Sequence, residues 1–179
     1  MMKEPFVILV DENDNQTGIT GKMKAHSESL LHRAVSVFII NSKGDWVLQR
    51  RALDKYHSKG LWTNTCCTHP LPEETTIQSA HRRLKEEMGI DCELTELFSF
   101  IYKEKLDNNL TEYEYDHVFF GISDQNPVIN ASEVEEWETV PFSDMHDDII
   151  KNPSNYTYWF KAIYEKVNMN ILKIQNPVL

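Results

Sequence analysis

The hydrophobic positions in the first third of the chain fall into short runs separated by polar turns. Strands are predicted at Phe6–Val10, Thr17–Thr20, Val35–Ile40 and Trp46–Arg50. Turn-forming residues fill the gaps at 11–15 and 41–45, so the last two strands are expected to form a hairpin. The polar stretch RALDKYHSKG, residues 51–60, then predicts a loop.

The segment at residues 63–70, TNTCCTHP, brings a thiol and an imidazole together in the sequence. It is typical of an extended chain that ends at a proline, so Cys67 and His69 are expected to project from the same face. A free cysteine is more often inert packing than a catalyst, and a lone histidine is more often a core or surface residue than a ligand. The spacing alone leaves both interpretations open. Cys66, on the opposite face, is expected to pack in the core.

The pattern changes to helical spacing from Glu73 onward. Apolar residues recur every three or four positions up to Gly89, a typical C-cap, and Glu73 and Glu74 are expected in the first turn. On the polar side of this helix, Arg83 and Glu87 are four residues apart and project together. A cation beside a metal-seeking carboxylate suits a ligand that is itself a complex of an anion with a metal.

The second half of the chain continues with strands and ends with helices. Strands are predicted within Glu93–Lys105, at Thr111–Gly121 and at Val134–Val140, with a turn at 107–109, and two helices are predicted after Ser143. In the alternating TEYEYD segment, Glu112, Glu114 and Asp116 share one face. The sum predicts a single domain, residues 1–179, of the α/β (α+β) class, with mixed sheets flanked by helices.

Composition argues against several classes of function. The formal net charge is −10 and no run of Lys or Arg occurs, so nucleic-acid binding has little electrostatic support. No stretch approaches ~18 consecutive apolar residues, and the first apolar run is too short and too close to acidic residues for a signal peptide. These features predict a soluble cytoplasmic protein that does not bind membranes. The three cysteines, an odd number, are expected to stay reduced.

The predicted helix also carries a family signature. Its residues match the spacing of a Nudix box at Glu74, Arg82, Leu84, Glu86, Glu87, Gly89 and Ile90. Two positions depart from that box. Thr68 replaces its Gly, and Arg83 replaces a Glu that helps hold the metals in the Nudix hydrolases. Together with LLHRAVSVFI, LQRRALDK, WTNTCCTHPL and TEYEYD, these departures make the chain resemble the type 1 isopentenyl diphosphate isomerases, from about residue 22 to residue 159.

The resemblance implies two metal sites. The positions that the isomerases use as ligands carry His26, His32, His69, Glu112 and Glu114, a mixed nitrogen and oxygen set acceptable to Zn²⁺, Mn²⁺ or Mg²⁺. Glu87 resembles a carboxylate that reaches a Mg²⁺ bound with the substrate diphosphate, where the alternative is a solvated helix face. The remaining histidines match no ligand position and are expected to be structural or surface residues: His57, His81, His117 and His146.

The resemblance also implies a reaction, the reversible movement of a double bond between isopentenyl and dimethylallyl diphosphates. Cys67 and Glu114 would be an opposed acid/base pair. Tyr102 would assist proton delivery, and Glu86 would support Cys67 or the metals. Trp159, otherwise an ordinary core anchor, matches an aromatic residue that stabilises positive charge over the hydrocarbon tail. The diphosphate would be bound by Lys22, Arg51, Lys55 and Arg83.

Two other functions are compatible with these residues. One is the hydrolysis of nucleotide diphosphate derivatives, against which Arg83 argues because it replaces the metal-holding Glu of the hydrolases. The other is a ligand-binding or zinc-stabilised module without catalysis. The expected partner is a small-molecule diphosphate, and the expected assembly is a monomer or a weak dimer.

Overall fold

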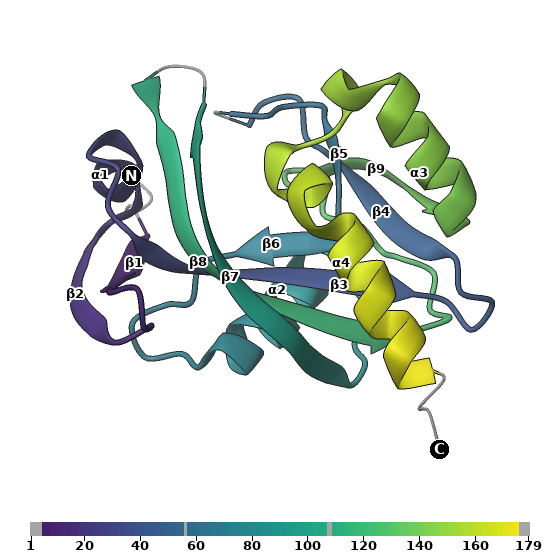
Figure 1. Ribbon diagram of the computed structural model, residues 1–179, viewed down its shortest axis with the longest axis horizontal. Coiled ribbons are helices and arrows are strands. Elements are labelled where there is room, and N and C mark those ends of the chain that lie inside the picture. Colours follow the sequence, from purple (N-terminus) through teal and green to yellow (C-terminus); the bar gives the residue numbers. More distant parts are fainter. Residues whose placement is uncertain (1–4, 56, 107–108, 176–179) are drawn as a thin grey trace.

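The computed structural model describes residues 5–55, 57–106 and 109–175, so most of the turn expected at 107–109 lies outside the described residues. The strands are β1 Phe6–Val10, β2 Gln16–Gly21, β3 His32–Ile40, β4 Trp46–Arg51, β5 Trp62–Thr63, β6 Cys66–Thr68, β7 Leu94–Lys105, β8 Thr111–Ile122 and β9 Val134–Val140. The α-helices are α1 Lys22–Ser27, α2 Thr76–Met88, α3 Phe142–Lys151 and α4 Tyr158–Gln175. In the described part, the strands form one mixed sheet with helices on both faces (Figure 1), which confirms the predicted fold class.

Strand β3 is the centre of the sheet. It runs parallel to β8, with His32 opposite Glu114, and antiparallel to β6, with Ser36 opposite Cys67. Strand β7 extends the sheet beyond β8 in antiparallel register. This register brings an imidazole, a carboxylate and a thiol onto three neighbouring strands, although they are far apart in the sequence.

Both faces of β3 are buried, because helices cover each of them (Figure 1). Phe38 and Ile40 pack in a cluster with residues of α3 and α4, whereas Val35, Val37 and Ile39 pack in a second cluster with residues of α2. The sequence of a strand that is buried on both faces is a continuous apolar run, whereas a strand with one exposed face alternates apolar and polar residues. Burial of each large side chain contributes about 1.5–3 kcal/mol, so β3 is firmly anchored in the core.

The expected hairpin of β3 and β4 pairs only next to its turn. Ile39 pairs with Val47 and Ile40 with Trp46, after which β4 leaves β3 and pairs with β5 and β9. The short strand β6 takes the vacated place beside the first half of β3. The extended segment expected at 63–70 is therefore two short strands, β5 and β6, separated by a bend.

Helix α2 begins later than expected, because Thr75 is its N-cap. The Thr75 hydroxyl accepts a hydrogen bond from the amide of Gln78, and the Gln78 side chain accepts one from the amide of Thr75. The prediction that Glu73 and Glu74 lie in the first turn was wrong, since both precede this cap. The predicted C-cap is confirmed, with Gly89 in the left-handed conformation at φ 67°.

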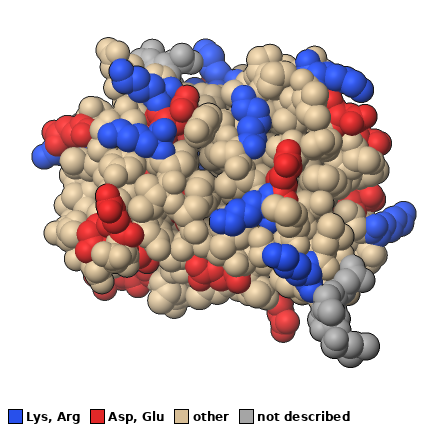
Figure 2. All heavy atoms as spheres, in the orientation of Figure 1, with Lys and Arg blue, Asp and Glu red and all other residues tan. Residues whose placement is uncertain are grey.

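The surface carries mixed charge. On the face shown in Figure 2, the Lys and Arg side chains are interspersed with Asp and Glu side chains. Within residues 5–55, 57–106 and 109–175, no helix is long and apolar enough to cross a membrane. The expected absence of nucleic-acid partners stays a prediction.

Candidate active site

A cavity of about 300 Å³ lies where β3, β6 and β8 meet α1, α2, the loop after β4 and the start of α4. Most of the predicted site residues line it: Lys22, Arg51, Lys55, Cys67, His69, Arg83, Tyr102, Glu112, Glu114 and Trp159. The fold therefore gathers side chains from seven separate segments around one space. Such a concave site with several convergent polar groups is the usual form of an active site.

Three imidazoles and one carboxylate meet beside this cavity, of which His69 and Glu114 line its wall and His26 and His32 lie buried behind them. His26, His32, His69 and Glu114 each offer a ligand atom, and these atoms lie within 4.8 Å of one another. The Nε2 atoms of His32 and His69 are 3.2 Å apart, and Nε2 of His69 is 2.8 Å from Oε1 of Glu114. Nδ1 of His32 lies 2.8 Å from the carbonyl oxygen of Leu30, to which it donates, so Nε2 is the ring nitrogen that is left to bind a metal. This donor set fits a divalent metal ion.

The protonation states in this group also suit a metal. Burial, followed by neighbouring positive charge, lowers the pKa of His26 to about 2 and that of His69 to about 4. Burial alone would raise the pKa of Glu114, but the imidazoles of His32 and His69 hold that pKa well below its ordinary value. Neutral imidazoles and an ionised carboxylate are the forms that bind metal.

Glu112 stands outside this four-residue group and contacts Tyr102. The hydroxyl of Tyr102 lies 3.0 Å from Oε2 of Glu112 and 2.6 Å from Oε2 of Glu114. A phenol has one proton, so both contacts are satisfied only if one carboxyl group keeps its own proton. Burial and the charge of Glu114 raise the pKa of Glu112, which identifies Glu112 as that group. Its role as a metal ligand stays a prediction.

Cys67 lines the cavity and has polar neighbours. Its Sγ is 3.2 Å from Oδ1 of Asn64 and 3.6 Å from Oγ of Ser36, which donates a 2.7 Å hydrogen bond to Asp116. Burial, and then the charge of Asp116, raise the pKa of Cys67, so its sulfur keeps its proton. Cys67 on β6 and Glu114 on β8 flank β3 from its two sides, because these strands are its neighbours there. A protonated thiol can act as an acid.

The predicted diphosphate-binding cations reach the cavity from separate elements. Lys22 begins α1, and Arg51 ends β4. Burial lowers the pKa of Lys22. The guanidinium carbon of Arg51 lies 5.3 Å from the centroid of the Trp159 ring, while its Nε donates to the carbonyl oxygen of Ser58 over 3.2 Å. The aromatic face of Trp159 is thus covered by a cation.

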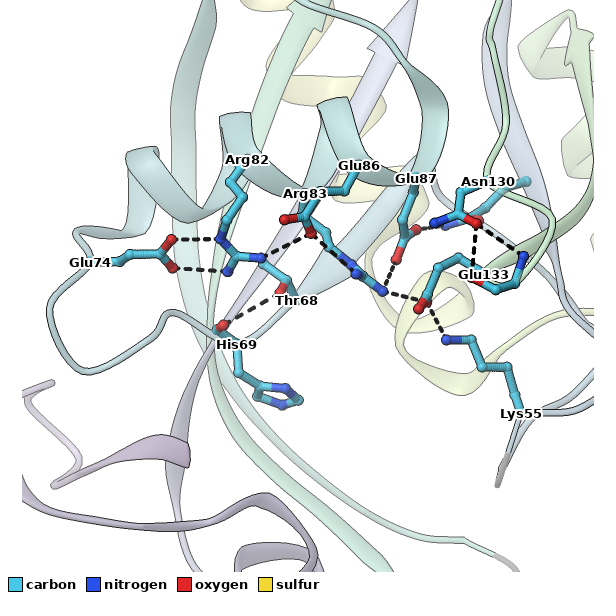
Figure 3. Close-up of polar contacts among 12 residues, drawn as sticks. Lys55, Thr68, His69, Glu74, Arg82, Arg83, Glu86, Glu87, Asn130 and Glu133 are labelled. Atoms are coloured by element: carbon cyan, nitrogen blue, oxygen red, sulfur yellow. Dashed lines mark hydrogen bonds and ion pairs between the residues drawn. The ribbon is translucent and has the colours of Figure 1, made fainter. Parts of the chain in front are cut away.

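The fourth predicted cation, Arg83 on α2, is held by two carboxylates, those of Glu87 and Glu133 (Figure 3). Its Nη2 lies 2.5 Å from Oε1 of Glu87 and pairs with Oε2 of Glu133, which also pairs with Nζ of Lys55. Glu87 also accepts a 2.7 Å hydrogen bond from Gln49 and does not itself line the cavity. Its carboxylate oxygens suit Mg²⁺, and its role as a ligand of that ion stays a prediction.

The surroundings of two further residues bear on their predicted roles. Glu86 is half exposed, and its carboxylate accepts hydrogen bonds from Arg82 and Arg83 (Figure 3), so its support of Cys67 or the metals stays a prediction. His57, expected to be a structural or surface residue, forms part of the buried cavity wall. Its ring centroid is 6.1 Å from that of Trp159 and its Nε2 is 3.6 Å from Glu112.

Four further residues of the site were missed by the sequence reasoning: Ser36, Asn64, Asp116 and Glu133. The alternation of the TEYEYD segment predicts that Asp116 shares a face with Glu112 and Glu114, but it indicates no role for Asp116. For Asn64 a signal existed, since it stands three residues before Cys67 in the extended segment. Glu133 had none, because it lies in a loop far from every motif.

Comparison with known proteins gives consistent results. Residues 30–160 match the NUDIX domain family. The chain is 50% identical over 164 residues to isopentenyl-diphosphate Delta-isomerase 2 of Aromatoleum aromaticum, an alignment that covers 92% of this chain and 87% of the relative. It is 47% identical to isopentenyl-diphosphate Delta-isomerase of Pectobacterium atrosepticum, with 90% of each chain covered. The crystal structure of DR0079 from Deinococcus radiodurans, at 18% identity, superimposes with a TM-score of 0.73 over 89% of this chain and 98% of that protein, which shows the fold alone.

Proposed function

Because this chain belongs to the NUDIX domain family and, within it, to the isopentenyl-diphosphate Delta-isomerases, we propose that it interconverts isopentenyl diphosphate and dimethylallyl diphosphate. Such an isomerase adds a proton to the terminal alkene carbon and removes a proton from the saturated carbon next to the other end of the double bond, so that the double bond moves by one position. The observation that carries the mechanism is the placement of Cys67 and Glu114, an acid and a carboxylate, on strands that flank β3 and line one cavity.

Cys67 and Glu114 are the acid/base pair in this proposal. The raised pKa of Cys67 keeps a proton on its sulfur, and the lowered pKa of Glu114 keeps its carboxylate ready to accept one. In one direction, one member of the pair gives its proton to the alkene while the other member takes a proton from the saturated carbon next to the double bond. In the reverse reaction the two residues exchange these roles. Tyr102 assists by its 2.6 Å hydrogen bond to Glu114, which lets a proton enter or leave the carboxylate.

The transition state has the character of a tertiary carbocation, because an unactivated alkene has no carbonyl group to absorb charge. Trp159 would stabilise it with its aromatic face, an interaction worth about 2 kcal/mol or more when desolvated. The guanidinium of Arg51 lies over that ring, which supports this role because it indicates that the aromatic face can bind a cation. The buried wall of the cavity would keep water from the cation.

Two metal sites complete the proposal. His26, His32, His69 and Glu114 would hold a divalent ion, with Glu112 as a further ligand, and the nitrogen donors favour Zn²⁺ or Mn²⁺ over Mg²⁺. A cation bound there would lower the proton affinity of Glu114. Glu87 would hold a Mg²⁺ that arrives with the diphosphate. The diphosphate itself would be bound by Lys22, Arg51, Lys55 and Arg83.

Proton exchange with solvent tests the proposal. The protein is incubated with isopentenyl diphosphate and Mg²⁺ in deuterated water, and the product is examined by NMR. We expect dimethylallyl diphosphate that carries deuterium. The absence of both product and exchange would contradict the isomerase, and phosphate release from nucleoside diphosphate derivatives would favour the hydrolase instead. A cytoplasmic location and a monomeric or weakly dimeric state stay predictions.

A further inference from the structure

Glu133 joins two cations that come from different parts of the chain. It directly precedes β9, lines the cavity, and is four-fifths buried, with 21% of its side chain exposed. Its Oε2 pairs with Nζ of Lys55 in the loop after β4 and with Nη2 of Arg83 on α2 (Figure 3). One carboxylate oxygen is thus shared by two positive side chains.

Without an anion between them, these two cations would repel each other. Lys55 stands on a loop and has many rotamers, so nothing in its own backbone directs its ammonium group toward Arg83. A charge-assisted hydrogen bond to each of them fixes both side chains at one side of the cavity. In a part-buried site this electrostatic effect is stronger than on an open surface.

The main chain around Glu133 connects the same two elements independently of the side chain. The carbonyl oxygen of Glu133 accepts a 3.0 Å hydrogen bond from the amide of Ala52, at the start of the loop that carries Lys55. The amide of Asn130 donates a 2.9 Å hydrogen bond to the carbonyl oxygen of Glu87, near the end of α2. A substitution that changes only the carboxylate therefore leaves these backbone links in place.

We propose that Glu133 is a positioning residue that holds Lys55 and Arg83 together, ready to receive the diphosphate group of the substrate. This inference rests on the proposed function, in which both cations bind that group. Glu133 contacts no reacting carbon in this scheme and acts only through the two cations. Its contribution belongs to substrate binding and not to the proton transfers.

Binding of inorganic diphosphate in the presence of Mg²⁺, measured by calorimetry, tests this role without requiring catalysis. Glu133→Gln keeps the shape of the side chain but removes its charge, so we expect the Kd to rise on the order of tenfold, the size typical of lost charge-assisted hydrogen bonds. For isopentenyl diphosphate, KM should rise by a similar factor while kcat stays within about twofold. Glu133→Asp, which keeps the charge, should recover part of the affinity.

A matched control is available on β9. Glu136 pairs with Arg50 at the surface and does not line the cavity, so Glu136→Gln removes a similar ion pair without changing diphosphate binding. Thermal unfolding of each variant identifies any loss of folding. In a double-mutant cycle, the effect of Glu133→Gln should shrink when Lys55→Met is already present, because the two residues act as a unit.

Several results would overturn the inference. Wild-type affinity in Glu133→Gln would show that the carboxylate does not position the cations, and a tighter Kd would show that it competes with the ligand. Failure of the wild-type protein to bind diphosphate would also overturn it, since the cations would then serve another purpose. If the wild-type protein binds diphosphate but does not isomerise isopentenyl diphosphate, the proposed function is wrong. The comparison of diphosphate affinity between the wild-type protein and Glu133→Gln would still test the role of Glu133.

Discussion

Tyr102 donates a 2.6 Å hydrogen bond to Glu114 within the buried wall of the cavity, from one strand to its antiparallel neighbour. The Tyr102→Phe substitution removes this bond with little change of shape. If the phenol helps a proton reach or leave Glu114, kcat should fall by about 10- to 100-fold, while KM changes little because the hydroxyl contacts the carboxyl groups of Glu112 and Glu114 and is assigned no part in binding the diphosphate. Steady-state kinetics with isopentenyl diphosphate measure both constants. Tyr115→Phe, which removes a 3.3 Å bond to Ser99, is the control.

The two adjacent cysteines should respond differently to alanine. Cys67→Ala removes the proposed acid and should lower kcat by about 10³-fold or more, with the metal content unchanged. Cys66 is fully buried in the cluster beneath α2, so Cys66→Ala should leave most of the activity and cost about 1 kcal/mol of stability. Kinetics, metal analysis and urea unfolding separate these effects. An active Cys67→Ala protein would refute the acid/base assignment.

Loss of one histidine from the proposed metal site should greatly weaken metal binding. We expect His32→Gln to bind less than a tenth of the metal that the wild-type protein binds, because three donors then remain where four converge. Metal analysis after dialysis measures this content. His117→Gln is the matched control, since His117 is bonded to Asp14 and Glu96 outside that group. Equal metal content in all three proteins would place the ion elsewhere.

Removing the metal with a chelator should lower the thermal stability of the wild-type protein. An ion at a concentration 100 times its Kd stabilises the folded state by about 2.7 kcal/mol, if it does not bind the unfolded chain. The same treatment should have little effect on His32→Gln, which has already lost its ion. Thermal unfolding with and without chelator measures the difference. A similar shift in both proteins would indicate that the chelator acts on another site.

His57 should make the metal-free protein sensitive to acid. Burial, and then the charge of Arg51, lower its pKa to about 3, whereas the unfolded chain has the ordinary value of about 6.5. Above pH 6.5 the ring is neutral in both states and has no effect. Below pH 6.5 the unfolded chain takes up a proton that the folded protein does not, so stability falls by up to about 1.4 kcal/mol per pH unit until the pH approaches 3.

The His57→Asn variant isolates this contribution from those of the other buried groups. Urea unfolding of the two metal-free proteins is measured at pH 7.5 and 5.5. The difference in their unfolding free energies should change by about 1.4 kcal/mol in favour of the variant at the lower pH. An unchanged difference would mean that His57 titrates alike in both states.

Local patterns predicted the strands and the helix end well. The β-branched run of β3 and the alternation of β8 each carry their own signal, and Gly89 is the C-cap that its position indicated. The metal group could be predicted only through the family resemblance, because its histidines are scattered along the sequence. Proximity of His32 to Glu114 depends on the parallel pairing of β3 with β8, and no local pattern specifies such a long-range register.

The rest of the site depends on how loops meet. Glu133 reaches Lys55 and Arg83 only because the segment before β9 is bonded to both the loop and α2, and nothing near it in the sequence indicates that contact. His57 enters the cavity wall from a loop whose polar composition predicts exposure. The helix α1, which carries Lys22 and His26, was also missed, since its six residues are too few to show a helical period.

The stacking of Arg51 on Trp159 has a consequence for which molecules can enter. If Trp159 binds the hydrocarbon tail as proposed, the tail can reach the ring face that Arg51 covers only after the guanidinium has left it, and a negatively charged head group would draw the guanidinium away. An alcohol of the same carbon skeleton has no such charge, so it would find the indole still covered. The proposed binding site of the tail would thereby favour molecules with a charged head group.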